Sequence, residues 1–153
     1  MATAAGRLSS QVGANLRRSS VILRGTDGGG DNGRMPEIVL STLNARYAHA
    51  SLGLRYLLAN LGELAPRAAL REFVIGQKTE DLAEALLAEA PRILGFGVYI
   101  WNVEETRRLV AQLRVLRPEL IIVLGGPEVS HEVEQQPICQ LADYVITGWG
   151  DVS

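Results

Sequence analysis

The stretch LIIVLGGPEVS, residues 120–130, decides the fold that we predict for this chain. It is a short apolar run rich in β-branched residues, and it stops at Gly125, Gly126 and Pro127. Such a run, without polar alternation, is typical of a strand buried on both faces in a parallel sheet. The glycines let the backbone approach a ligand, and Pro127 suits the first position of a helix whose free N–H groups face that ligand. The sequence therefore predicts an α/β core with a binding edge after this strand.

Strands and helices are expected to alternate along the chain from Met35 onward. The other apolar strands are predicted at residues 37–42, 69–75, 92–99 and 143–147, with 69–75 at an edge of the sheet. Helices are predicted from Ser51 to near Gly62, from Thr79 to before Pro91, from a capping box of Asn102 and Glu105 to before Pro118, and near residues 128–136. Five parallel strands with helical crossovers predict a flavodoxin-like, Rossmann-like, doubly wound sheet in the order 2-1-3-4-5.

Composition indicates one folded domain preceded by an extension. The chain has 153 residues, is 47% hydrophobic and carries a formal net charge of −2. Residues 1–34, rich in Arg, Ser and Gly, cannot bury a core, so we expect a disordered extension before a domain at 35–153. Met35 as the true start and an organellar transit peptide are the alternatives for that extension. The domain carries more acidic than basic residues, which argues against nucleic acid as its ligand.

Cysteine content and hydropathy indicate the cellular compartment of the protein. A single cysteine, Cys139, excludes a disulfide framework within the chain and cannot by itself hold a zinc ion or an iron–sulfur cluster. No apolar run approaches the roughly 20 residues of a membrane span. We therefore expect a cytoplasmic protein that has no membrane partner.

Polar and aromatic residues gather after the predicted strands, at one edge of the sheet. Because parallel strands end at the same edge, these residues point to one large site, and its aromatic side chains suit a broad, flat, partly apolar ligand. They are Asn44, Arg46, Tyr47, His49 and Ser51 after the first strand, Tyr99, Trp101 and Asn102 after the third, Gly125, Gly126, Glu128 and Ser130 after the fourth, and Trp149, Gly150 and Asp151 after the fifth.

Four blocks carry a resemblance to a known family: NARYAHASLGLRYL (44–57), GFGVYIWN (95–102), GGPEVS (125–130) and TGWGD (147–151). In this order and spacing, over about residues 36–151, they resemble the amino-terminal cobalamin-binding domain of B12-dependent radical S-adenosylmethionine enzymes. The resemblance implies a corrin over the carboxyl edge, with its nucleotide tail beside the glycines of strands three and four. The implied cofactor-binding residues are Asn44, Tyr47, His49, Ser51, Gly97, Tyr99, Trp101, Asn102, Gly125, Gly126, Pro127, Glu128, Ser130, Gly148, Trp149 and Gly150.

The resemblance also implies that the chemistry lies elsewhere in a longer protein. Methyl transfer or rearrangement would take place in a downstream radical domain that holds a 4Fe–4S cluster and S-adenosylmethionine. The family's motif of three closely spaced cysteines is not in this chain. We therefore expect this chain to be a cofactor-binding fragment without catalytic residues of its own.

His49 is the candidate cobalt ligand, although its surroundings depart from the pattern of the better-known B12 domains. Those domains carry Asp-x-His-x-x-Gly, whereas here Tyr47 replaces the aspartate and Gly53 comes one residue late. The carboxylate that would orient such a histidine is missing. A hydrogen bond from His49 to the cofactor tail, or a cap of the loop, is the favoured alternative.

A second class of function is a non-catalytic sensor or receiver-like α/β domain that binds a nucleotide or a protein partner. A phosphate-accepting receiver needs a carboxylate cluster after strands one and three, and the chain offers Ser41, Thr42 and Tyr99 there. Gly95 and Gly97 also have a purely structural alternative, which is close packing of a helix on a central strand.

The predicted domain is truncated, because a flavodoxin-like sheet needs a helix after its fifth strand and the sequence ends there. We expect the apolar side chains under that helix to lie bare and to form an interaction surface. The side chains expected in this position are those of Ile122, Leu124, Val145 and Ile146.

Overall fold

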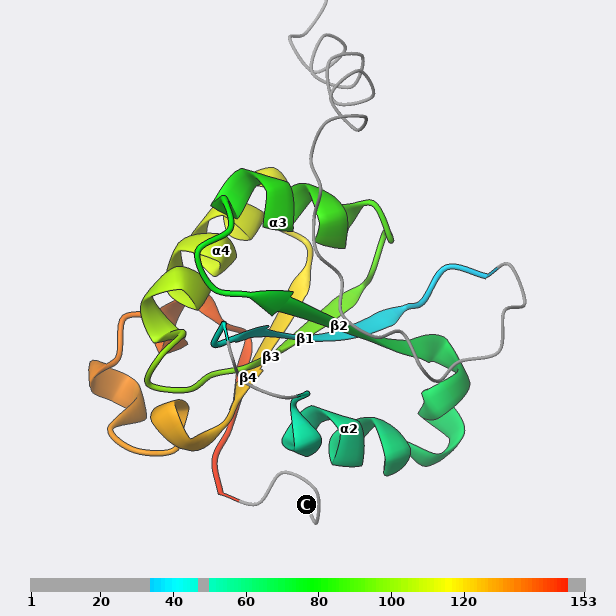
Figure 1. Ribbon diagram of the computed structural model, residues 1–153, viewed down its shortest axis with the longest axis horizontal. Helices are drawn as coiled ribbons and strands as arrows, with labels where there is room; N and C mark the ends of the chain where they lie inside the picture. Colours follow the sequence, from blue (N-terminus) through cyan, green and yellow to red (C-terminus); the bar gives the residue numbers. More distant parts are fainter. Residues whose placement is uncertain (1–33, 47–49, 149–153) are drawn as a thin grey trace, which may run out of the picture.

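The computed structural model describes residues 34–46 and 50–148, which form one parallel sheet with helices on both faces (Figure 1). The strands are β1 (Ile38–Asn44), β2 (Ala68–Val74), β3 (Ile93–Gly97), β4 (Ile121–Gly125) and β5 (Tyr144–Ile146). Their order is β2-β1-β3-β4-β5, and every pair is parallel. The predicted flavodoxin-like order and the edge position of the second strand are confirmed.

Three α-helices cover the sheet unequally. Helices α3 (Thr79–Leu87) and α4 (Val103–Leu116) lie on one face, and α2 (Leu52–Ala59) lies alone on the other (Figure 1). The Ser51 hydroxyl accepts the N–H of Leu54 at 3.5 Å and so caps α2, as the sequence predicted. None of the helices in the described ranges is long and apolar enough to cross a bilayer.

The larger hydrophobic core lies between the sheet and the helices α3 and α4. Leu94 of β3 and Ile122 and Leu124 of β4 are fully buried there against Leu109 and Leu113 of α4. A smaller cluster of Leu40, Leu54 and Leu70 lies under α2. The two clusters show which side chains of each strand point toward α2. Only those side chains can reach a site beside that helix.

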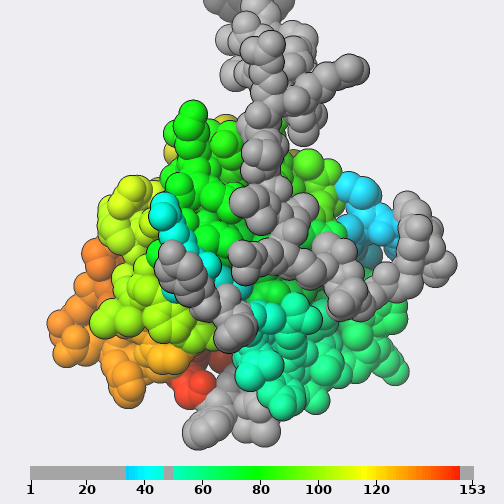
Figure 2. All heavy atoms as spheres, viewed as in Figure 1, coloured from blue at the N-terminus to red at the C-terminus, as the bar shows by residue number. Residues whose placement is uncertain are grey.

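The strip of sheet beside α2 is the less covered face, and the prediction of its bare residues is right for Ile146 and wrong for the other three. Ile122 and Leu124 were predicted to lie bare, but each is 0% exposed because alternate side chains of β4 point to opposite faces. Val145 is half-buried against the larger core, whereas Tyr144 and Ile146 are 64% and 37% exposed. Figure 2 shows the last described residues of the chain (red) at the surface between α2 and residues 127–135.

The predicted helix near residues 128–136 is also wrong. The segment consists of two 3-10 turns, η2 (Pro127–Val129) and η3 (Val133–Gln135), and a third turn, η4 (Cys139–Leu141), follows. Between the first two, Glu132 has φ +50°, a left-handed conformation that a continuous α-helix does not contain. A fourth 3-10 turn, η1 (Gly62–Arg67), leads from α2 into β2.

Candidate functional site

The carboxyl ends of the central strands meet as predicted. In the register of the sheet Thr42 lies beside Gly97, and Gly97 lies beside Gly125. The loops after β1, β3 and β4 therefore share one edge of the described structure. Among the predicted site residues, Tyr47, His49, Trp149 and Gly150 lie outside the described residues.

Gly97 and Gly125 lie side by side on the face that carries α2, and Gly97 is buried whereas Gly125 is half-buried. A Cβ atom on Gly97 would have its nearest neighbours, in Leu54 and Tyr99, at 3.5 Å, and one on Gly125 would meet Ile146 at 3.9 Å. These are ordinary van der Waals distances, and neither glycine has a positive φ. The fold therefore tolerates alanine at both positions, so its own packing does not explain why both are glycine.

Gly126, in contrast, is required by the fold itself. Its φ is +115°, and a Cβ there would overlap the carbonyl oxygen of Val98. The same carbonyl accepts the N–H of Glu128 at 3.4 Å, and the N–H of Ser130 donates to Pro127. Pro127 does begin η2 as expected, but the prediction that the free N–H groups of this turn face a ligand is wrong for Glu128 and Ser130.

Asn102 is the N-cap residue of α4, where the sequence predicted the helix to begin, but its side chain braces the strand ends and makes no capping hydrogen bond. Its side chain is fully buried and its Nδ2 donates to the carbonyl oxygens of Leu43 at 3.0 Å and Gly97 at 3.2 Å. Its Oδ1 accepts the N–H of Tyr99 at 2.8 Å. Glu105 forms no capping box, because its carboxylate accepts the N–H of Gly76 instead. The Asn102 amide thus holds the ends of β1 and β3 together.

Tyr99 and Trp101 form an aromatic platform after β3. Their rings stack with centroids 4.6 Å apart and planes 6° apart, and Trp101 is 49% exposed. Tyr99 extends from Gly97 toward α2, where a Cβ on Gly53 would lie 3.5 Å from its hydroxyl. This pair gives the edge a flat, partly apolar surface, which suits the flat, partly apolar ligand that the sequence predicted.

Ser130 joins the two loops that follow β4 and β5. Its hydroxyl donates to the carbonyl oxygen of Gly126 at 2.8 Å and accepts the N–H of Gly148 at 3.3 Å. Pro127 is exposed at this rim and Glu128 is half-buried. These contacts place the predicted residues of both loops at the same edge as Gly125.

Glu72 of β2 is a buried carboxylate that the sequence reasoning missed. Its carboxylate accepts hydrogen bonds from Asn44, Ser51 and Arg55, and the residue is 3% exposed. The signal was available, because in an alternating strand Glu72 lies on the same face as the apolar Leu70, which is the buried side. A charged residue at an inward position of a strand requires partners.

No metal site can be assembled from the described residues alone. They contain no group of three or more His, Cys, Asp or Glu side chains close enough to hold an ion. Cobalt ligation by His49 stays a prediction, since that residue lies outside the described part of the chain.

Comparisons with known proteins bear on the family and the fold of this chain. The protein-family model of the B12 binding domain matches residues 38–153. A crystal structure of a cobalamin-binding protein from Desulfitobacterium hafniense DCB-2 matches with a TM-score of 0.53 and 22% identity over 77% of this chain. The match covers 55% of that protein, so the chain spans about half its length. A CheY-like protein from Pseudomonas aeruginosa PAO1 matches with a TM-score of 0.53 and 20% identity, over 73% of this chain and 81% of that one. No curated protein matches the chain.

Proposed function

Because the chain belongs to the B12-binding domain family, we propose that it binds cobalamin at the carboxyl edge of its sheet, next to α2. The corrin would lie over the loops after β1, β3 and β4, with the Tyr99 and Trp101 rings beside it. The nucleotide tail would run over Gly97 and Gly125 toward the strip of sheet beside α2. Once bound, cobalamin supplies a cobalt centre able to carry a methyl group or to form a radical.

The observation that carries this proposal is the pair of glycines that the fold does not need. Gly97 and Gly125 are neighbours in register and point to the same face, and a Cβ on either would find ordinary contacts. Glycine in a strand is unfavourable by about 0.5–1 kcal/mol relative to alanine, so two adjacent ones call for a reason outside the strand. Close approach of a ligand supplies that reason.

Different described residues have different roles in the proposed binding of cobalamin. Gly97 and Gly125 add no side chain on the face that the tail would approach, and the stacked pair Tyr99 and Trp101 offers an apolar rim to a flat ring system. Asn102 keeps the ends of β1 and β3 at a fixed spacing. Asn44, Ser51, Pro127, Glu128, Ser130 and Gly148 lie around the same edge and remain proposed contacts or supports.

We further propose that the parent protein is a B12-dependent radical S-adenosylmethionine enzyme, with a 4Fe–4S cluster and S-adenosylmethionine in a downstream radical domain. The support is the order and spacing of the four sequence blocks. The coding sequence after Ser153 tests this part alone. A downstream Cys-x-x-x-Cys-x-x-Cys supports it, and a different domain there overturns it while leaving cobalamin binding untouched.

A receiver-like sensor is the second candidate function, because the CheY-like protein shares the fold. The described residues weaken it. Thr42 donates to the carbonyl oxygen of Gly97, and Ser41 donates to that of Arg71, so the hydroxyls near the carboxyl end of β1 are engaged in the fold. The position after β3 carries Tyr99 rather than a carboxylate.

Titration with hydroxocobalamin tests the proposed function in the full chain, followed by the visible spectrum of the cofactor and by tryptophan fluorescence. The variant Gly97→Ala/Gly125→Ala should keep or slightly raise the melting temperature, since both methyl groups fit. It should raise the Kd for cobalamin roughly tenfold or more, because the added methyl groups occupy the surface that the tail approaches.

Gly95→Ala is the matched control in the same strand. Its added methyl group would lie 2.9 Å from Leu40 Cδ2, where a flexible side chain already fills the space, so it should leave the Kd near the wild-type value. A wild-type chain that leaves the spectrum and the fluorescence unchanged would refute cobalamin binding. A double variant that binds as tightly as the wild type would show that Gly97 and Gly125 are not part of the cobalamin site.

A further inference from the structure

We infer that Glu72 is a positioning residue for the cofactor site, because it holds the start of α2 at a fixed place above the carboxyl ends of β1 and β2. This inference rests on the proposed function, because it takes cobalamin as the ligand of the site. It concerns a residue that would not touch the cofactor and that none of the four sequence blocks contains.

Glu72 is the only charged side chain among the described residues that is buried. Burial of a carboxylate is costly unless each oxygen has a partner, and an apolar side chain beside Leu70 would avoid that cost. Replacement of a buried ion pair by well-packed apolar residues is often neutral or stabilising. Stability alone therefore does not account for a carboxylate at this position, and its directional bonds become the relevant property.

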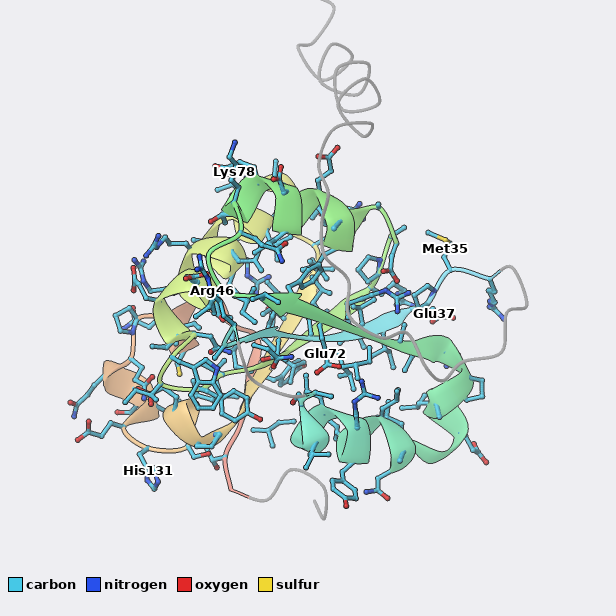
Figure 3. All side chains as sticks on the ribbon, viewed as in Figure 1. Met35, Glu37, Arg46, Glu72, Lys78 and His131 are labelled. Carbon is cyan, nitrogen blue, oxygen red and sulfur yellow. The ribbon has the colours of Figure 1, made fainter. Side chains whose placement is uncertain are left out.

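These bonds come from three places that the chain must bring together. Asn44 Nδ2, at the end of β1, lies 3.1 Å from Oε1 of Glu72, and the N–H of Ser51, the N-cap of α2, lies 2.5 Å from the same oxygen. Arg55 Nη2, one turn into α2, lies 2.9 Å from Oε2. Glu72 therefore fixes both the position and the rotation of the first turn of α2 (Figure 3).

That turn covers Gly97, one of the two glycines over which the cofactor tail would run. Leu54, one residue before Arg55, supplies two of the three nearest atoms to a Cβ on Gly97, and Gly53 faces the hydroxyl of Tyr99. A shift of the first turn would change the width of the space between α2 and β3. The geometry thus connects a carboxylate on an edge strand with the surface that the cofactor tail would follow.

Hydroxocobalamin titrations of Glu72→Gln, Arg55→Met and the double variant test the inference. Glutamine keeps an oxygen for Ser51 and Asn44 but cannot accept from Arg55, so each single change breaks the same bond. We expect each to raise the Kd roughly tenfold, the scale on which a loosely held site loses affinity. The double variant should be no worse than either single one, because both changes remove the same bond.

Glu89→Gln is the matched control. Glu89 pairs with Arg71, which precedes Glu72 in β2 but points to the opposite face, and both side chains of that pair are largely buried. Its loss should lower the melting temperature by an amount similar to that of Glu72→Gln and leave the Kd unchanged. A Glu72→Gln chain that binds like the wild type, or a Glu89→Gln chain that loses as much affinity, would overturn the positioning role.

A readout without cofactor separates this inference from the proposed function. The amide chemical shifts of Gly53 and Leu54 in the free protein should change in Glu72→Gln and remain unchanged in Glu89→Gln. If the wild type fails to bind cobalamin, the proposed function fails, and these shifts alone decide whether Glu72 places α2. Unchanged shifts in Glu72→Gln would refute that placement.

Discussion

Two adjacent glycines at the end of β4 have different causes. Gly125 faces the surface beside α2, where a side chain would meet only Ile146 at an ordinary distance. Gly126 has φ +115° and packs directly on the backbone of Val98. The second is thus explained by the chain's own turn into η2, whereas the first is not required by the fold and is assigned to the proposed ligand, although in the sequence they form a single Gly-Gly pair.

A comparison of the stabilities of two alanine variants separates the causes of these two glycines. Gly126→Ala should lower the free energy of unfolding by roughly 2–4 kcal/mol, because it adds both a strained φ and an overlap with Val98. For a domain of this size that corresponds to a fall in the melting temperature of about 10 °C. Gly125→Ala serves as the control and should melt near the wild-type temperature. Equal melting temperatures for the two variants would show that Gly126 is not required by the fold.

At the scale of elements, the short strand β5 depends on one charged cluster at its start. Asp143 Oδ2 accepts the N–H of Ile122 at 2.7 Å and a guanidinium N–H of Arg114 at 2.6 Å. Arg114 also donates to the carbonyl oxygens of Leu141 and Leu120, each at 2.7 Å. The cluster therefore connects α4, β4, η4 and β5 at the amino edge, opposite the proposed site.

The element-scale prediction concerns this cluster. Arg114→Met should lower the melting temperature by several degrees, because two carbonyl oxygens and one carboxylate lose a donor. Arg117→Met is the control, since Arg117 pairs with Glu119 at an exposed position where an ion pair contributes little. Thermal melts followed by circular dichroism would measure both. Equal losses would show that the cluster does not hold β5.

The same cluster predicts that the stability of the fold depends on pH. The N–H of Ile122 and then Arg114 lower the pKa of Asp143 below its ordinary value of 3.8. Its stabilising contribution is therefore present above that ordinary value and is lost as the pH falls through the lowered pKa. Melting temperatures of the wild type should fall more steeply below about pH 4 than those of Asp143→Asn. Parallel curves would remove Asp143 from the acid transition.

At the scale of the whole molecule, the sequence predicted the sheet order because each apolar run and each crossover is a local feature. It did not predict which face of β4 and β5 is covered, since period-two alternation gives two sides without saying which side meets helices. The prediction of a helix near residues 128–136 was wrong because the left-handed conformation of Glu132 has no clear signal in the sequence. Gly97, Gly125 and the aromatic pair were found in the candidate site, whereas the role of Glu72 depends on partners that are 17 to 28 residues away.

The two faces of the sheet should therefore respond differently to substitution. Tyr144 and Ile146 point to the strip beside α2 and are 64% and 37% exposed, whereas Val145 between them packs against the larger core. We expect the double variant Tyr144→Ser/Ile146→Ser to bind a hydrophobic dye less than the wild type, with a small change in melting temperature. Cobalamin should also reduce dye binding to the wild type, because its tail would pass over Gly125 beside Ile146.

Val145→Ser is the control for this last prediction, because it places a hydroxyl against the larger core. It should lower the free energy of unfolding by about 1–3 kcal/mol and should not reduce dye binding. The contrast follows from alternation alone, since the three residues are consecutive in one strand. If Val145→Ser lost dye binding while the double variant kept it, the faces would be reversed, and the strip beside α2 would be neither the exposed apolar surface nor the path proposed for the cofactor tail.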